Sequence, residues 1–140
     1  MRRQLRLGKQ RGVRGVRVGF FDTARYQDGT PVAFVAAVNE FGARGRVNIP
    51  ERPFFRNANH RAKKIVTDFV QQRISPRTMF LSRRNAGLLG TVLQQNLQQS
   101  IVDLRHPPNS PVTIALKGGK SNPLVDTGFM VNSVTYEIIR

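Results

Sequence analysis

The sequence has 140 residues, the length of one domain, and contains no cysteine, which excludes disulfides, thiolate catalysis and cysteine-based zinc sites. Lys and Arg number 23 against 8 Asp and Glu, a net charge of +15 that lies almost wholly within residues 1–84. Such a field attracts polyanions or acidic protein surfaces, although it can also serve only to keep a surface soluble. The basic start lacks the apolar segment of a secretory signal, and no apolar stretch reaches the roughly 18 residues of a membrane-spanning helix, so we expect no membrane partner.

Residues 1–12 are basic and show no apolar periodicity, which predicts a flexible arm in front of one domain over residues 13–140. The strongest basic cluster lies in and just after this arm. We expect it to contact a polyanion or an acidic partner, through Arg2, Arg3, Arg6, Lys9, Arg11 and Arg14. From residue 13 to 20 apolar and polar residues alternate, which predicts a half-buried strand.

Residues 31–41 are predicted to form a short helix, because valines recur every three residues from Val32 and Gly42 suits a C-terminal cap. The β-branched content keeps a buried strand open as an alternative. The loop that follows, up to Pro50, contains an apolar alternation around Asn48 that fits a short edge strand.

Two long amphipathic helices are predicted next, over residues 51–75 and 82–104. Apolar residues follow a 3-4 spacing in the first helix, and a leucine stripe runs from Leu89 to Leu104 in the second. The other face of the second helix is rich in glutamine. Such amides can pack on a neighbouring segment or remain solvated.

The last third of the chain is predicted as a long loop over residues 105–123, a helical turn within 125–133 capped by Asp126 or Thr127, and a strand over 134–139. This order of elements predicts an α+β fold. Two long helices would pack on a small antiparallel sheet, with a flexible N-terminal arm and a long loop outside it.

The chemistry-bearing residues form no catalytic, cofactor-binding or metal-binding pattern, so we expect a protein that is not an enzyme. His60 and His106 have no second His, Asp or Glu at ligand spacing. The stretch from Lys117 to Lys120 lacks the strand and helix that flank a phosphate-binding loop. Asp126 is interpreted as a helix cap.

Two segments carry a resemblance to a known family. Residues 35–58 read VAAVNEFGARGRVNIPERPFFRNA, an apolar helix ending in Glu-Phe-Gly and a loop that leads to Ile-Pro-x-Arg-Pro-Phe. Residues 111–138 read PVTIALKGGKSNPLVDTGFMVNSVTYEI. In this order the segments resemble the tail-completion, or head–tail joining, proteins of long-tailed bacteriophages, and they are similar to the Mu-like virion-morphogenesis proteins and the lambda minor tail protein Z. The basic first 17 residues and Asn39 depart from the family pattern.

The resemblance implies a structural virion protein, assembled in the cytoplasm of the host bacterium, that forms a six-fold ring at the top of the tail and enables head–tail joining. Its partners would be copies of itself, the tail tube or tail terminator protein, head-side connector proteins and the phage DNA that passes through the ring. Residues of the two segments would contact neighbouring subunits or partners: Glu40, Phe41, Arg52, Phe54, Phe55, Lys117, Leu124 and Asp126.

Adjacent residues on a helix point about 100° apart, so Phe54 and Phe55 cannot both face one core stripe. Either one of them reaches a neighbouring subunit or both lie in a broad core. Two other functions also remain open at this point: a tail terminator, which would use a similar small ring subunit, and a basic module that binds DNA without sequence preference.

Overall fold

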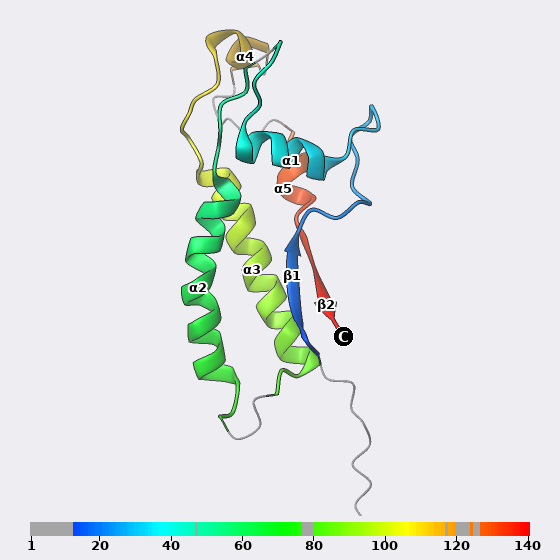
Figure 1. Cartoon of the computed structure of the whole chain (residues 1–140), viewed down its shortest axis with the longest axis vertical. Coiled ribbons are helices and arrows are strands. Elements are labelled where there is room, and N and C mark those ends of the chain that lie inside the picture. The colour runs from blue at the N-terminus through cyan, green and yellow to red at the C-terminus, as the bar shows by residue number, and fades with distance from the viewer. Residues whose placement is uncertain (1–12, 47, 77–79, 117, 120–123, 125–126) are drawn as a thin grey trace, which may run out of the picture.

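The computed structural model describes residues 13–46, 48–76, 80–116, 118–119, 124 and 127–140. The elements in chain order are β1 (Gly15–Gly19), α1 (Val32–Phe41), α2 (Phe54–Arg73), α3 (Arg83–Asp103), α4 (Pro111–Leu116), α5 (Phe129–Asn132) and β2 (Thr135–Ile139). Figure 1 shows their arrangement. The predicted α+β class is confirmed, as is the helix, rather than a strand, over residues 31–41.

β1 and β2 come from opposite ends of the chain and form a two-stranded antiparallel sheet. On its exposed face Arg17 lies opposite Glu137 and donates two hydrogen bonds to the carboxylate, at 2.8 and 2.5 Å. On the other face Val16 and Val18 line a small hollow together with Leu97 of α3. This two-sided pattern is the cause of the alternation in the sequence.

α2 and α3 lie side by side as a helical hairpin, and the sheet lies against α3 (Figure 1). The close approach of α3 to β2 depends on Gly90, because a Cβ atom there would lie 2.3 Å from the ring of Tyr136. The prediction of two long helices is confirmed, but the two helices do not contact the sheet equally. α3 contacts both strands, and α2 packs mainly on α3.

The glutamine-rich face of α3 contacts the C-terminal segment instead of remaining solvated. Gln94 donates through Nε2 to the carbonyl of Val134 at 2.9 Å, and Gln98 donates to the carbonyl of Val131 at 3.2 Å. These bonds hold the end of α5 and the approach to β2 along α3.

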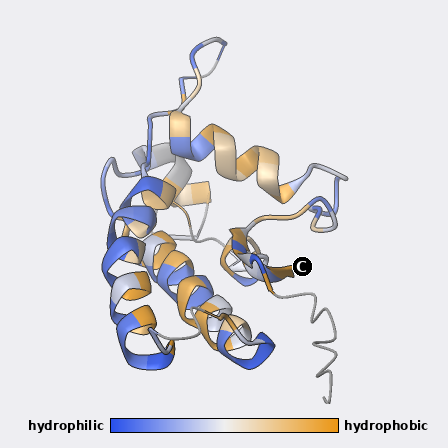
Figure 2. Cartoon of the chain, turned by 60° about the horizontal axis from the view of Figure 1, so that its bottom comes forward, coloured by the Kyte–Doolittle hydropathy of each residue, from blue (hydrophilic) through white to orange (hydrophobic). Residues whose placement is uncertain are grey.

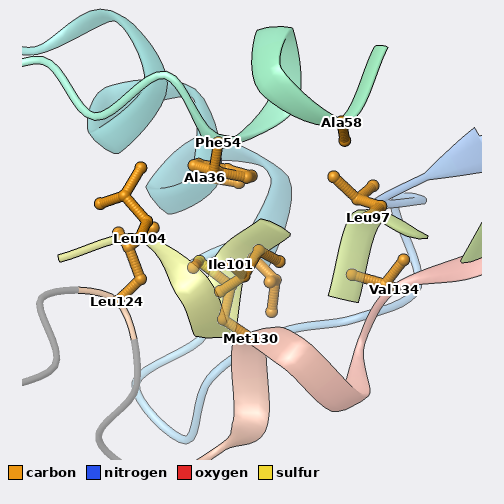
Figure 3. Packing of buried hydrophobic residues seen from close by; sticks show 10 residues of the cluster. Ala36, Phe54, Ala58, Leu97, Ile101, Leu104, Leu124, Met130 and Val134 are labelled. Atoms are coloured by element: carbon orange, nitrogen blue, oxygen red, sulfur yellow. The ribbon is translucent and has the colours of Figure 1, made fainter. Parts of the chain in front are cut away.

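The core lies where α1 and α5 cross one end of the α2–α3 hairpin (Figure 3). Fully burying each large apolar side chain here contributes about 1.5–3 kcal/mol to folding. The cluster consists of Val32, Ala36, Phe54, Ala58, Leu97, Ile101, Leu104, Leu124, Met130 and Val134.

Three details differ from the sequence prediction. α2 begins at Phe54 rather than at residue 51, because a residue before proline, here Arg52, is disfavoured in the α conformation. α4 lies inside the predicted 105–123 loop, so that part of the prediction is wrong. Pro111 is compatible with the start of a helix, because the N–H that proline lacks would have no partner within the helix at that position. The expected edge strand is reduced to one bridge, in which Ala43 and Ile49 exchange two backbone hydrogen bonds of 2.9 Å.

Candidate functional site

Glu40, the last residue but one of α1, caps the start of α2. It is only 4 % exposed, and its carboxylate accepts from the backbone N–H groups of Phe55 at 2.7 Å and of Arg56 at 3.2 Å. α2 has Pro53 at its N-cap, which supplies no side-chain acceptor. The carboxylate therefore satisfies two first-turn donors and faces the positive end of the helix dipole. The Glu-Phe-Gly segment thus fixes α1 against α2.

The Arg56 guanidinium completes this junction from the solvent side. Its Nε donates to the Glu40 carboxylate at 2.8 Å, and its Nη2 donates to the Glu40 carbonyl at 3.0 Å and to the carboxylate of Glu51. Hydrogen bonds to Glu40 first, and then to Glu51, raise the pKa of Arg56. The charge of Arg56 is therefore matched within the chain.

Arg52 is a buried cation that joins three segments. Its Nη1 donates to Oδ1 of Asn39 at 3.1 Å, its Nη2 to Oδ1 of Asn109 at 3.2 Å and its Nε to the carbonyl of Pro107 at 3.4 Å. Arg52 is 6 % exposed, and this burial lowers its pKa. Because the planar guanidinium reaches all three acceptors at once, Arg52 clamps residues 107–109 onto the junction of α1 and α2.

Phe54 and Phe55 point in different directions. Phe54 is 1 % exposed and packs edge-on against Phe20, with ring centroids 6.4 Å apart. Phe55 is 39 % exposed. The reasoning that the two rings cannot share one core stripe is confirmed, and of the pair only Phe55 reaches the surface.

The exposed side of this junction is an apolar groove of about 430 Å³ between the end of β1, α1 and the start of α2. Phe41, on α1, is 70 % exposed. Figure 2 shows that α1 is hydrophobic along most of its length. We call this surface the α1 groove, and its apolar lining includes Val18, Phe21, Ala33, Ala37, Phe41 and Phe55.

Two arginines stand at the edge of the α1 groove, and both are already paired. The Cζ atom of Arg17 lies 5.1 Å from the ring centroid of Phe21 while its nitrogens bond to Glu137. The Cζ atom of Arg56 lies 5.8 Å from the ring centroid of Phe41. Since carboxylates of the chain match both cations, the α1 groove suits an apolar occupant rather than an acidic one.

The residues expected to contact partners divide into three groups. Phe41 and Phe55 lie together on the surface, in the α1 groove. Those buried in the chain have intramolecular roles, so the structure gives no support to direct partner contact by Glu40, Arg52, Phe54 and Leu124. Lys117 and Asp126 lie outside the described residues. The N-cap residue of α5 is Gly128 rather than Thr127, the other predicted cap, although the Thr127 hydroxyl accepts from the backbone N–H of Phe129 at 3.3 Å.

The basic cluster of the N-terminus lies mostly outside the described residues, which leaves Arg2, Arg3, Arg6, Lys9 and Arg11 without a structural account. Arg14 is exposed, and its backbone N–H donates to the carbonyl of Ile139 at 2.8 Å. His60 and His106 are both exposed. In the part of the chain that the structure describes, no group of three His, Asp or Glu side chains could hold a metal ion.

Sequence reasoning missed the partners that make the junction. Asn39, Arg56 and Asn109 were not identified, because a tertiary hydrogen bond leaves no periodic signal. One signal was available: α2 begins after a proline and without a Ser, Thr, Asp or Asn at the cap, so its first donors need an acceptor from elsewhere.

No protein-family model matches the sequence, and searches of curated proteins and of solved structures give no significant match. Among the described residues, no helix combines the length and the apolar character needed to cross a bilayer.

Proposed function

We propose that this protein is a structural subunit of a tailed-phage particle, a tail-completion or head–tail joining protein that forms a ring at the top of the tail. It is a component of the virion and acts by assembly rather than by catalysis. The observation that carries the proposal is the α1 groove, an exposed apolar surface built by the segment that resembles this family.

The buried residues of that segment support the proposal indirectly. Glu40 and Arg52 use their charged groups to hold the junction of α1 and α2 in one geometry. A rigid junction presents Phe41 and Phe55 in fixed positions. Fixed aromatic side chains lose little entropy on binding and are common anchors of protein interfaces.

The occupant of the α1 groove is a second copy of the chain. A ring requires that one face of a subunit fit a different face of the next, and the described surface carries exposed apolar residues outside the groove as well as in it. Leu116 at the end of α4 is 84 % exposed, and Val92 on α3 is 40 % exposed. Stable interfaces bury about 800 Å² on each partner, so the α1 groove would be the centre of a larger contact.

Replacing Phe41 with Ser tests this interface. Phe41 is 70 % exposed, so its loss leaves the core intact. A central aromatic anchor is worth about 2 kcal/mol or more, which corresponds to about a 30-fold weaker association between subunits. The matched control is Phe80→Ser, since Phe80 is 45 % exposed and lies between α2 and α3, outside the lining of the α1 groove.

Sedimentation velocity measures the outcome, on the protein alone and with phage tails that lack it. We expect a closed ring for the wild type and for Phe80→Ser, and dissociated subunits for Phe41→Ser. A wild type that stays monomeric in both conditions, or equal behaviour of the two variants, would contradict the proposal. A tail terminator is the alternative within the same class, and tails of uncontrolled length in its absence would identify it.

A further inference from the structure

One end of the molecule carries a group of exposed arginines that lies outside the α1 groove. α2 ends and α3 begins there, and β1 starts and β2 finishes at the same end (Figure 1). One hydrogen bond joins α3 to α2, from Asn85 Nδ2 to the carbonyl of Arg73 at 3.2 Å. Another joins the start of β1 to the end of β2, from the N–H of Arg14 to the carbonyl of Ile139. We call this group the arginine pole, and its members are Arg14, Arg73, Arg83 and Arg84.

The charge of the arginine pole is not matched by the described part of the chain. The salt bridges among the described residues all use cations outside the pole. The carboxylate of α2, that of Asp68, bonds to Lys64 at 2.7 Å. In contrast, the arginines at the edge of the α1 groove are paired. The pole therefore presents at least four free positive charges to solvent.

Helix stability does not explain the arginines at the start of α3. The helix has no acidic residue in its first turn, and Arg83 and Arg84 occupy its first two positions. The helix dipole disfavours cations at these positions, because the N-terminal end of a helix carries partial positive charge. Only Arg73, in the last turn of α2, is favourably placed. Two cations held against the dipole are better explained by a partner than by folding.

The chemistry of this surface favours a phosphate backbone. Guanidinium groups bind phosphate oxygens in a bidentate manner, and interfaces with DNA are much more positively charged than interfaces between proteins. The segment of sequence that leads into Arg14 adds five further cations within residues 1–12. We infer that the arginine pole binds the phosphodiester backbone of duplex DNA without reading its sequence.

This inference deepens the proposed function by placing the DNA-facing side of the subunit at the end opposite the loop that the Ala43–Ile49 bridge closes, called here the 43–49 hairpin (Figure 1). The inference rests on the proposed function only in taking the bound DNA to be that of the phage. Ring assembly through the α1 groove and DNA binding at the pole are measured separately, so either can fail without the other.

The test compares two double variants that remove equal charge. Arg83→Gln/Arg84→Gln removes two cations from the pole. Arg44→Gln/Arg46→Gln removes two exposed cations from the 43–49 hairpin at the other end (Figure 1). Binding to duplexes of about 20 base pairs, in two unrelated sequences, is followed by fluorescence anisotropy over a range of salt concentrations. The slope of log K against log salt is negative, and each lost phosphate contact reduces its magnitude by about 0.9.

We expect the magnitude of this slope to fall by about 1.8 for the pole variant on both duplexes, and the hairpin variant to keep the wild-type slope. Equal losses for the two variants would overturn the inference, because binding would then follow net charge alone. An absence of salt-dependent binding would also overturn the inference. Displacement of the DNA by polyglutamate at equal charge would overturn it too, and would identify an acidic protein as the partner. Circular dichroism checks folding, and Arg14→Gln/Arg73→Gln supplies a second pole variant that leaves α3 unchanged.

Discussion

Replacing Glu40 with Gln removes one charge and leaves the size of the side chain unchanged. The carboxylate accepts three hydrogen bonds from α2, two from backbone N–H groups at 2.7 and 3.2 Å and one from Arg56 at 2.8 Å. The amide of Gln keeps one acceptor oxygen and turns an NH₂ group toward donors. At least one buried donor therefore loses its partner.

The magnitude follows from these contacts. Loss of a helix cap costs about 0.5–2 kcal/mol, and a buried donor left unpaired costs about 1–3 kcal/mol. The pair with Arg56 adds little, because the Arg56 side chain is 52 % exposed. We expect Glu40→Gln to lower the free energy of unfolding by about 2–4 kcal/mol.

Urea denaturation followed by circular dichroism measures this change. With a slope near 2 kcal/mol per molar urea, the midpoint would fall by about 1–2 M. Glu51→Gln is the control, because Glu51 bonds to the same arginine but is half exposed and caps no helix. It should cost under about 1 kcal/mol. If Glu40→Gln costs no more than Glu51→Gln, the reasoning that the capping of α2 stabilises this junction is refuted.

Two further substitutions test the packing and the clamp. Gly90→Ala should destabilise the protein by about 1–3 kcal/mol, because the new Cβ would lie 2.3 Å from the ring of Tyr136. Gly87→Ala should instead stabilise α3 by up to about 1 kcal/mol, because the nearest atom to its new Cβ is 3.8 Å away. Melting temperatures that shift in the same direction for both variants would contradict this packing. Arg52→Lys should lower the free energy of unfolding by about 1–3 kcal/mol, because a single ammonium cannot reach three divergent acceptors, and denaturant midpoints equal to wild type would show that residues 107–109 are held in another way.

Local patterns predicted most of the elements. The alternation over residues 13–20 and the valine spacing over 31–41 identified β1 and α1, because one face of each is buried. The pairing of β1 with β2 was not readable in this way, since nothing in a strand's own pattern names its partner across the chain. α4 was missed because proline and glycine around it indicate a loop, although Pro111 at its first position is compatible with a helix.

The candidate site was predicted less completely than the fold. The motif residues were identified as a group, but sequence alone did not separate Glu40 and Arg52, which work inside the fold, from Phe41 and Phe55, which face solvent. That division depends on how α1 lies across the start of α2. The arginine pole has the same origin, because the segments that carry Arg14, Arg73 and Arg84 end on one side of the molecule only in the folded chain.

Electron microscopy of particles from a phage that cannot produce this protein tests the proposed role most directly. Without the ring, heads packed with DNA and tails of normal length would accumulate separately, and supplying the protein would join them into infectious particles. Intact infectious particles in its absence would contradict a place for this chain at the head–tail junction.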